Sequence, residues 1–567
     1  MPECERHGRP TAARLLARCL EVEGVTHVFG VPGEENIDLL DALADSSIRF
    51  VPTRHESGAA FIANVLGRLT GRAGVCLATL GPGATNMLTG VADATQDFAP
   101  VVAITGQTAL AHMHKESHQT IDSRTLYEPV TKWSVRVLRG ETVPEIVGKA
   151  FRLAEAEKPG AVHIELPEDV AESPVYGDAL WVRAPSREAA APPEPSDAAV
   201  RAAAACIRDA RRPVILAGHG VVRAGAVEAL RRFARELGIP VLNTFMAKGV
   251  MPPEDPLSLL TVGLQSRDYP MVALEEADLV IAVGYDAIEY APERWNPGGR
   301  VPVVHISRTP PDPEVHYPVC AEVIGGLAAA LERLRATVGR RVPCEAAAGW
   351  RALVEARILG WGAGAATARD RAGLDPRAAL RPLEPWLARG ATVVSDVGAH
   401  KVWVARHLQT GRPNSVLISN GFAAMGIAVP GAVAAKLVRP DRPAIALAGD
   451  GGFLMTCAEL ETAHRLGTPI IIIVWVDGGY GLISWKQELK FGRVFGTSFT
   501  NPDLSRLAEA FSAHYAYAPT AEALASVLET AAQADRSTII EVPIDYTANL
   551  RLSEELESAA AAAGTRR

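Results

Sequence analysis

The sequence predicts an α/β protein made of three doubly wound parallel-sheet domains. Short apolar runs end at a glycine at five places, namely 101–105, 214–217, 279–283, 393–397 and 444–448. Amphipathic helical stretches separate these runs, and apolar strands that alternate with helices indicate parallel sheets covered on both faces. The length of 567 residues is consistent with three to four domains of about 150 residues each.

Two changes in composition divide the chain into three expected domains. Residues 181–200 are rich in alanine and proline, and residues 336–370 have little strand pattern, so both are expected to connect domains. The domains are therefore expected near 8–180, 195–335 and 370–550.

Charge and cysteine usage narrow the class of protein. Lys plus Arg is 57 against 65 for Asp plus Glu, giving a net charge of −8, which argues against a nucleic-acid surface and favours small-molecule partners. The seven cysteines are scattered without a CxxC pair, as expected of reduced thiols. The N-terminus has no apolar signal segment, and the run 470–476 is far shorter than the roughly 20 residues of a membrane span. We therefore expect a cytoplasmic protein without a membrane partner.

The strongest motif is a glycine-rich turn with two acidic residues. Gly449, Asp450, Gly451 and Gly452 follow the strand 444–448, and Asp477 follows the strand 470–476. Both carboxylates are thus expected at the carboxyl ends of strands of one parallel sheet, where doubly wound folds bind ligands. Hard oxygen ligands with room for phosphate favour Mg²⁺. Alternatively, Asp450 only caps a helix and the glycines after Asp477 only form a turn.

A second motif is Arg54-His55-Glu56, followed by apolar residues at helical spacing that place Glu56 on the buried side. A buried carboxylate suits a group that shares a proton with a ring nitrogen. Alternatively, Thr53 and Glu56 form a capping box in which Glu56 only binds the Thr53 amide. The helix alone favours the capping box.

Both motifs resemble those of the thiamine-diphosphate enzymes that act on 2-oxo acids. The GDG turn with an acidic residue some 25 positions later is similar to their diphosphate signature, and Glu56, 81–86 and 104–107 occur in the order of their pyrimidine-binding domain. The chain most resembles the acetolactate synthase group, nearest its catabolic, flavin-independent branch. Further segments that carry the resemblance are 29–33, 129–133, 159–160, 166–167, 284–290 and 295–296.

The resemblance implies a pyrimidine-binding, a central and a diphosphate-binding domain, with roles for individual residues. It makes Asp450, Asp477 and the Gly479 carbonyl the ligands of Mg²⁺, and Glu56 the catalytic residue that binds the aminopyrimidine nitrogen. The central segment 284–290 lacks the arginine-rich stretch of the flavin branch, so a functional FAD is not implied. The other implied contacts of thiamine diphosphate are Val397, Gly398, His400, Met425, Gly449, Gly451, Gly452, Tyr480 and Leu482.

The substrate side rests on weaker matches. The resemblance makes Gln119 a catalytic residue that lines the substrate site, with Lys132 further along the same face. Trp485 and Lys486 depart from the residues of the family at these positions, and a lysine there could bind an acceptor carboxylate or lie in solvent. The three histidines of the loop 112–118 suggest a transition-metal site as a further alternative.

The implied reaction is decarboxylation of pyruvate followed by ligation of the two-carbon unit to a second 2-oxo acid, giving 2-acetolactate from two pyruvates. The resemblance also implies a homo-oligomer, a dimer or a tetramer, because active sites of the family lie between subunits. One alternative keeps the cofactor but makes the protein a 2-oxo-acid decarboxylase or carboligase that uses an aldehyde or another acceptor. A second alternative is a non-catalytic protein that binds thiamine diphosphate.

Overall fold

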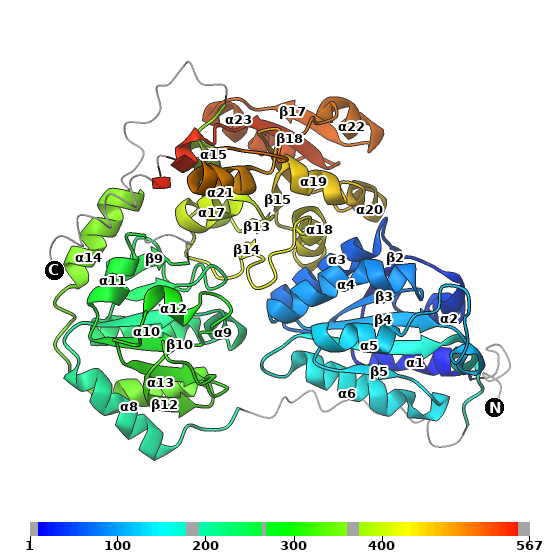
Figure 1. Cartoon of the computed structure of the whole chain (residues 1–567), viewed down its shortest axis with the longest axis horizontal. Helices are drawn as coiled ribbons and strands as arrows, with labels where there is room; N and C mark the ends of the chain where they lie inside the picture. Colours follow the sequence, from blue (N-terminus) through cyan, green and yellow to red (C-terminus); the bar gives the residue numbers. More distant parts are fainter. Residues whose placement is uncertain (1–9, 177–191, 264–267, 360–372, 551, 554–567) are drawn as a thin grey trace. The chain divides into compact units, whose positions relative to one another are not determined.

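A computed structural model describes residues 10–176, 192–263, 268–359, 373–550 and 552–553 (Figure 1). Its strands form three six-stranded sheets in which every pair is parallel, so the predicted fold class is confirmed. The chain forms two compact units, one comprising 1–189, 421–441 and 454–470, and the other the remaining residues. In the described part of the chain, no helix is long and apolar enough to span a membrane.

The first sheet has the strand order β2-β1-β3-β4-β6-β5. Mainly aliphatic side chains from one face of the sheet and from the helices that cover this face form a core cluster, as the low aromatic content of the sequence requires. The strands are β1 (His27–Gly30), β2 (Arg49–Pro52), β3 (Gly74–Ala78), β4 (Val101–Gln107), β5 (Ser134–Arg136) and β6 (Ala161–Pro167). The helices are α1 (Ala12–Val22), α2 (Ile37–Ala44), α3 (Glu56–Thr70), α4 (Pro82–Gln96), α5 (Ser123–Tyr127), α6 (Val143–Glu155) and α7 (Glu168–Glu172).

The second sheet has the order β12-β11-β10-β7-β8-β9. Gly218 and Gly220, after the first of its strands, pack against the backbone of Gly284, so these glycines serve a close backbone approach. The strands are β7 (Pro213–Ala217), β8 (Val241–Asn243), β9 (Ser258–Thr261), β10 (Leu279–Val283), β11 (Val303–Ser307) and β12 (Val319–Ile324). The helices are α8 (Asp197–Asp209), α9 (Gly220–Arg223), α10 (Val227–Leu237), α11 (Met271–Glu276), α12 (Pro292–Trp295), α13 (Leu327–Val338) and α14 (Ala347–Val354).

The third sheet has the order β14-β13-β15-β16-β18-β17. The strands are β13 (Thr392–Ser395), β14 (Val416–Ile418), β15 (Ala444–Gly449), β16 (Ile471–Val476), β17 (His514–Tyr517) and β18 (Thr538–Pro543). The helices are α15 (Pro376–Leu380), α16 (Glu384–Ala388), α17 (Ala399–His407), α18 (Ala428–Val438), α19 (Asp450–Thr456), α20 (Glu459–Leu466), α21 (Gly481–Phe491), α22 (Leu504–Ala510) and α23 (Ala521–Ala531). Of these, α18 and α20 belong to the first compact unit.

The three sheets lie within the three expected domains, whose exact boundaries stay predictions. Part of the expected connection 336–370 is helical, because α14 lies within it. Arg351 of α14 is buried and donates to the carbonyls of Ser258 and Pro253, which attaches this helix to the second sheet's domain. Six of the seven cysteines lie in the described residues, and none of these six forms a disulfide.

One face of the first sheet carries buried polar side chains where apolar ones would be usual. His163 of β6 is fully buried, with its Nε2 2.9 Å from Thr105 Oγ1 and its Nδ1 2.9 Å from Ser134 Oγ. The ring stacks on Tyr127 with centroids 4.0 Å apart. Burial, helped by the charge of Arg136, lowers the pKa of His163 to about 3.

This histidine is expected to make the protein less stable in acid. The unfolded chain binds a proton at His163 near its ordinary value of 6.5, whereas the folded chain does so only near 3. Because the unfolded state then holds more protons, the free energy of unfolding should fall as the pH falls through this window, by about 1.4 kcal/mol per pH unit at most. Denaturant unfolding at several pH values should show a steeper acid loss for the wild type than for His163→Gln; equal slopes would contradict the assignment.

Candidate active site

The two predicted acidic ligands lie at one edge of the third sheet. Strands β15 and β16 are parallel neighbours, with Gly449 opposite Trp475, so the residues that follow both strands reach the same edge. Asp450 is buried, and its Oδ2 accepts hydrogen bonds from the Gly478 amide at 2.8 Å and the Asp477 amide at 3.3 Å. Its Oδ1 accepts one from the Gly451 amide at 2.8 Å. Asp450 therefore joins the two strand-end turns, which a cap of α19 alone would not do.

Asn501 is a member of this site that the sequence motif does not include. Its Nδ2 donates to Asp450 Oδ2 at 2.7 Å, across 51 positions of the sequence. The turn after β16 is held by an antiparallel pairing with 497–499, in which Tyr480 N donates to Thr497 O and Phe499 N to Gly478 O. The sequence gives no signal for this pairing, because residues 497–503 have no strand or glycine pattern.

The electrostatics of the pair favour a bound cation. Partial desolvation, followed by the nearby charge of Asp450, raises the pKa of Asp477 to about 7, although part of the residue is exposed to solvent. Two carboxylates held this close repel each other, and a divalent ion with oxygen preference would relieve the repulsion.

In the described residues, no group of three or more His, Cys, Asp or Glu side chains could hold a metal ion. The three histidines of the loop 112–118, all of them described, therefore do not form the alternative transition-metal site.

A glycine-lined cradle lies beside the acidic pair. His400, near the start of α17, is buried, and burial lowers the pKa of its ring to about 4, so the ring is neutral at pH 7. A Cβ added to Gly398 would lie 2.8 Å from the His400 ring, and one added to Gly449 3.3 Å from it. A Cβ on Gly452 would lie 3.0 Å from the carboxylate of Asp396. Side chains at these three positions would fill the space that the glycines leave.

Glu56 is the first residue of α3 and is 9% exposed. The capping box does not form, because the Thr53 amide donates to Gly30 O and His55 is the N-cap, accepting from the Ser57 amide. Instead, Asn86 Nδ2 of α4 donates to Glu56 Oε2 at 3.0 Å. The carboxylate is thus oriented by a neighbouring helix, not by its own helix terminus.

Glu459 of α20 binds the backbone just before α3, and the sequence motifs do not include it. It is buried, accepts hydrogen bonds from the amides of Arg54 and His55 at 3.1 Å each, and receives the Thr462 hydroxyl at 2.6 Å. A Cβ on Gly58 would clash with its carboxylate at 2.3 Å. Burial raises the pKa of Glu459. Glu459 therefore fixes the start of the helix that carries Glu56, although it lies some 400 positions away in the sequence.

Helix α4 and the residue that follows it hold the segment that carries Met425. Asp97 Oδ1 accepts from the Gly421 amide at 2.7 Å, and Asp93 Oδ1 from the Ala424 amide at 3.1 Å. Ala423 adopts a left-handed conformation with φ of 60°, and Thr456 Oγ1 donates to Gly426 O at 2.7 Å on the other side. Met425 itself is half-buried, so its backbone is fixed while part of its side chain stays accessible.

Removal of Asp97 is expected to destabilise the first compact unit strongly. Asp97 pairs with Arg68 at 3.5 Å, and both side chains are almost fully buried. Asp97→Ala leaves this guanidinium charge and the Gly421 amide without that acceptor, which should cost about 3–5 kcal/mol of unfolding free energy. Chemical denaturation measures the loss, with the exposed pair Arg389–Glu529 as the control, where Glu529→Ala should cost far less because solvent screens a surface pair. Equal costs for the two variants would contradict this account.

The substrate-side residues have unequal environments. Gln119 is exposed and adopts a left-handed conformation with φ of 54°. Lys132 Nζ donates to the carbonyls of Ala156 and Lys158 at 2.7 and 2.6 Å, so a substrate role would require these bonds to break. Trp485 is half-buried with its Nε1 donating to Ser553 Oγ at 3.0 Å, whereas Lys486 is exposed.

The remaining predicted residues lie at strand ends or in the helical turns that follow them. Val397 and Gly398 follow β13, Gly449 ends β15, Gly451 and Gly452 lie in α19, Gly479 and Tyr480 precede α21, and Leu482 lies in its first turn. Tyr480 packs edge-to-face on Phe499, with centroids 5.1 Å apart, and its ring lies against Gly451.

Family models match the chain in three consecutive regions. They are described as the N-terminal TPP-binding, central and C-terminal TPP-binding domains of thiamine pyrophosphate enzymes, and they match residues 10–126, 200–334 and 396–542. The chain belongs to the thiamine pyrophosphate enzymes. Within this family it is acetolactate synthase-like, as the following relatives show.

The catabolic acetolactate synthase of Raoultella terrigena is 36% identical over 97% of this chain and 98% of its own length. The acetolactate synthase of Bacillus subtilis is 35% identical over 96% of this chain and 95% of its own length. An acetolactate synthase of Mycobacterium bovis is 33% identical over 88% of this chain and 82% of its own length. The similarity to acetolactate synthases therefore covers all three domains.

The residues of this acetolactate synthase-like enzyme fit the cofactor of its family. Among the described residues, none forms a hydrogen bond with the buried His400 Nε2, which leaves a polar atom beside the glycine cradle for a ligand. The backbone amides at the starts of α17 and α21 offer the donors that phosphate oxygens need. Asp450, Asp477 and the Gly479 carbonyl supply only oxygen, the set expected for a diphosphate-bound Mg²⁺.

Proposed function

We propose that this enzyme decarboxylates pyruvate on thiamine diphosphate and joins the two-carbon unit to a second 2-oxo acid, giving 2-acetolactate from two pyruvates. One observation carries the proposal. The chain keeps both a buried Glu56 oriented by Asn86 and a buried Asp450 joined to the Asp477 turn, in a sequence similar to acetolactate synthases throughout. A protein that only bound the cofactor would need the acidic pair but not Glu56.

The cofactor, when bound, supplies an acidic carbon and an electron sink for decarboxylation. The protein's own part begins with Glu56, whose carboxyl would exchange a proton with the aminopyrimidine nitrogen while Asn86 keeps the carboxyl in place. Asp450 and Asp477, with the Gly479 carbonyl, would hold Mg²⁺ and thereby the diphosphate. Val397, Gly398, His400, Gly449, Gly451 and Gly452 would line the diphosphate, and Met425, Tyr480 and Leu482 the rings.

On the substrate side, Gln119 would donate a hydrogen bond to the 2-oxo acid. The half-buried Trp485 is held by Ser553, so we assign it to packing, and we assign the exposed Lys486 to the surface near the acceptor. The proposed chemistry transfers no net electrons and so needs no FAD. We place the enzyme in the cytoplasm.

We further propose that the enzyme is a homo-oligomer, at least a dimer. The segment 480–495 of the second compact unit exposes several large apolar side chains, among them Phe491 at 62% and Phe495 at 85%. The backbone of Phe495 is held in place, because Gln487 binds both its amide and its carbonyl. A fixed, exposed apolar surface is typical of a protein interface. Light scattering of the purified protein measures the mass, and a monomer at micromolar concentration would contradict this.

The reaction is tested by supplying a panel of 2-oxo acids with thiamine diphosphate and Mg²⁺ and identifying the products by mass spectrometry. The proposal expects 2-acetolactate from pyruvate alone. Acetaldehyde as the main product, or no product until an aldehyde is added, would favour the decarboxylase or carboligase alternative. Binding of thiamine diphosphate without carbon dioxide release from any 2-oxo acid would favour the non-catalytic alternative.

A further inference from the structure

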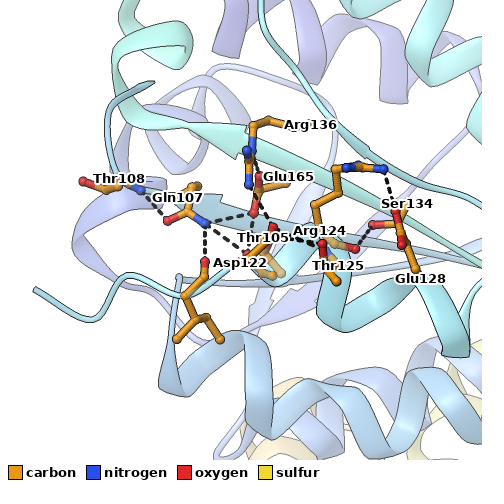
Figure 2. Close-up of polar contacts among 12 residues, drawn as sticks. Thr105, Gln107, Thr108, Asp122, Arg124, Thr125, Glu128, Ser134, Arg136 and Glu165 are labelled. Carbon is orange, nitrogen blue, oxygen red and sulfur yellow. Dashed lines mark hydrogen bonds and ion pairs between the residues drawn. The ribbon is translucent and has the colours of Figure 1, made fainter. Parts of the chain in front are cut away.

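A buried polar cluster lies on the first sheet (Figure 2). One of its members, Gln107, directly precedes the loop 108–122 that carries Gln119. Thr105 of β4, Glu165 of β6 and Arg136 of β5 stand opposite one another in the parallel register, so their side chains share one face. Glu165 is fully buried and accepts hydrogen bonds from Ser123 at 2.5 Å, from Gln107 at 2.9 Å and from Arg136. The proposed reaction does not use this cluster.

Gln107 is the member of the cluster that binds both ends of the loop 108–122. Its Oε1 accepts from the Thr108 amide at 2.9 Å, where the loop begins. Its Nε2 donates to Ile121 O at 2.9 Å, where the loop ends, and to Glu165 Oε1 at 2.9 Å (Figure 2). A carboxylate paired with a guanidinium accepts hydrogen bonds but donates none. Glu165 therefore orients the Gln107 amide so that its Nε2 faces Ile121 and its Oε1 faces Thr108.

The loop brings the backbone of Gln119 against the turn before α4. A Cβ added to Gly81 would lie 2.4 Å from Gln119 O, so only glycine permits this approach. Asn86, which binds Glu56, lies in the first turns of the same helix. Gln119 has a left-handed backbone, and a residue other than glycine keeps this conformation only where its surroundings hold it.

We propose that Gln107 is a positioning residue for the substrate: by closing the loop 108–122 at both ends, it holds Gln119 where its amide can bind a 2-oxo acid. Glu165, Arg136 and Ser123 serve this arrangement by orienting Gln107. The inference deepens the proposed function and rests on it for the identity of the substrate. The mechanical part, closure of the loop by Gln107, is independent of the reaction.

The test combines Gln107→Met, which keeps the length of the side chain but not its hydrogen bonds, with Gln119→Ala and the double variant. Gln107→Met should lower kcat/KM for pyruvate by about 10- to 100-fold. The double variant should lie within about threefold of Gln119→Ala alone, because Gln107 then has no Gln119 amide left to position. Effects that multiply in the double variant would overturn the proposal.

Hydrogen exchange of the enzyme saturated with thiamine diphosphate and Mg²⁺ tests the closure without reference to activity. Gln107→Met should speed exchange in 108–122 at least tenfold and leave that of the Glu56 helix unchanged. Ser134→Ala is the matched control, since it removes a buried hydroxyl on the same sheet face that does not bind the loop, and loop exchange should stay at the wild-type rate. Unchanged loop exchange in Gln107→Met would overturn the proposal.

Ser123→Ala provides the same comparison if Gln107→Met does not fold, because it removes one partner of both Gln107 and Glu165. Faster loop exchange is then expected, and wild-type exchange would count against the proposal. A wild type that forms no 2-acetolactate but shows the expected exchange would refute the proposed function and leave the closure intact. A wild type that forms 2-acetolactate, with wild-type loop exchange in the variants, would refute the closure by Gln107 and leave the proposed function intact.

Discussion

Glu56→Gln is expected to lower kcat for 2-acetolactate formation by about 100- to 10,000-fold, the usual contribution of a positioned proton-transfer group. Glutamine can accept the hydrogen bond of Asn86 but cannot exchange a proton with the cofactor. The variant should therefore fold and bind thiamine diphosphate, since the change is nearly isosteric. Steady-state kinetics with pyruvate, together with cofactor titration by fluorescence, separates the two effects.

A suitable control is Glu145→Gln, on an exposed position of α6 in the same domain. It makes the same chemical change and should leave both measurements at wild-type values. Wild-type turnover by Glu56→Gln would show that this carboxyl does not take part in proton transfer. Weaker cofactor binding with wild-type turnover at saturating cofactor would mean that Glu56 acts through affinity alone.

Asp450→Ala is expected to remove activity through loss of the metal. The change removes one proposed Mg²⁺ ligand and the acceptor shared by the Gly478 amide and Asn501. We expect activity at millimolar Mg²⁺ to fall at least about 100-fold, the upper end of the effect of losing a group that supports a metal ligand. The rise in unfolding temperature that Mg²⁺ with thiamine diphosphate gives the wild type should also disappear.

Asp477→Asn provides the matched comparison, because an amide oxygen can still bind Mg²⁺. This change removes one of two repelling charges, and partial desolvation together with the charge of Asp450 already raises the pKa of Asp477 to about 7. It should therefore retain Mg²⁺-dependent activity, with its main change in the concentration of Mg²⁺ required. Equal loss of activity in both variants would contradict the assignment of Asp450 as the residue that organises the site. Chelation of the wild type should abolish activity reversibly.

The sequence predicted those parts of the site that depend on neighbouring residues. The apolar strands that end at glycine gave the three sheets, and the strand-end rule placed Asp450 and Asp477 at one edge of β15 and β16. The helix after Arg54-His55-Glu56 was also predictable, but its pattern alone favours a capping box. The structure shows otherwise, because the Thr53 amide donates to Gly30 O and Asn86 binds Glu56 instead.

The groups that sequence reasoning missed act over long sequence separations. Asn501 binds Asp450 from 51 positions away, and Glu459 binds the start of α3 from more than 400. Neither residue has a local pattern, since an asparagine in a loop and a glutamate in a short helix are ordinary. Gln107 was included in a family motif, but its role at both ends of a loop depends on the parallel register of β4 and β6.

The ratio of pyruvate consumed to carbon dioxide released tests the central claim most directly. Ligation of the two-carbon unit to a second pyruvate consumes two pyruvate molecules for each carbon dioxide, whereas simple decarboxylation consumes one. We expect the wild-type enzyme with thiamine diphosphate and Mg²⁺ to give the two-to-one ratio, with 2-acetolactate accounting for the remaining carbon. A one-to-one ratio with acetaldehyde as product would contradict the proposed function.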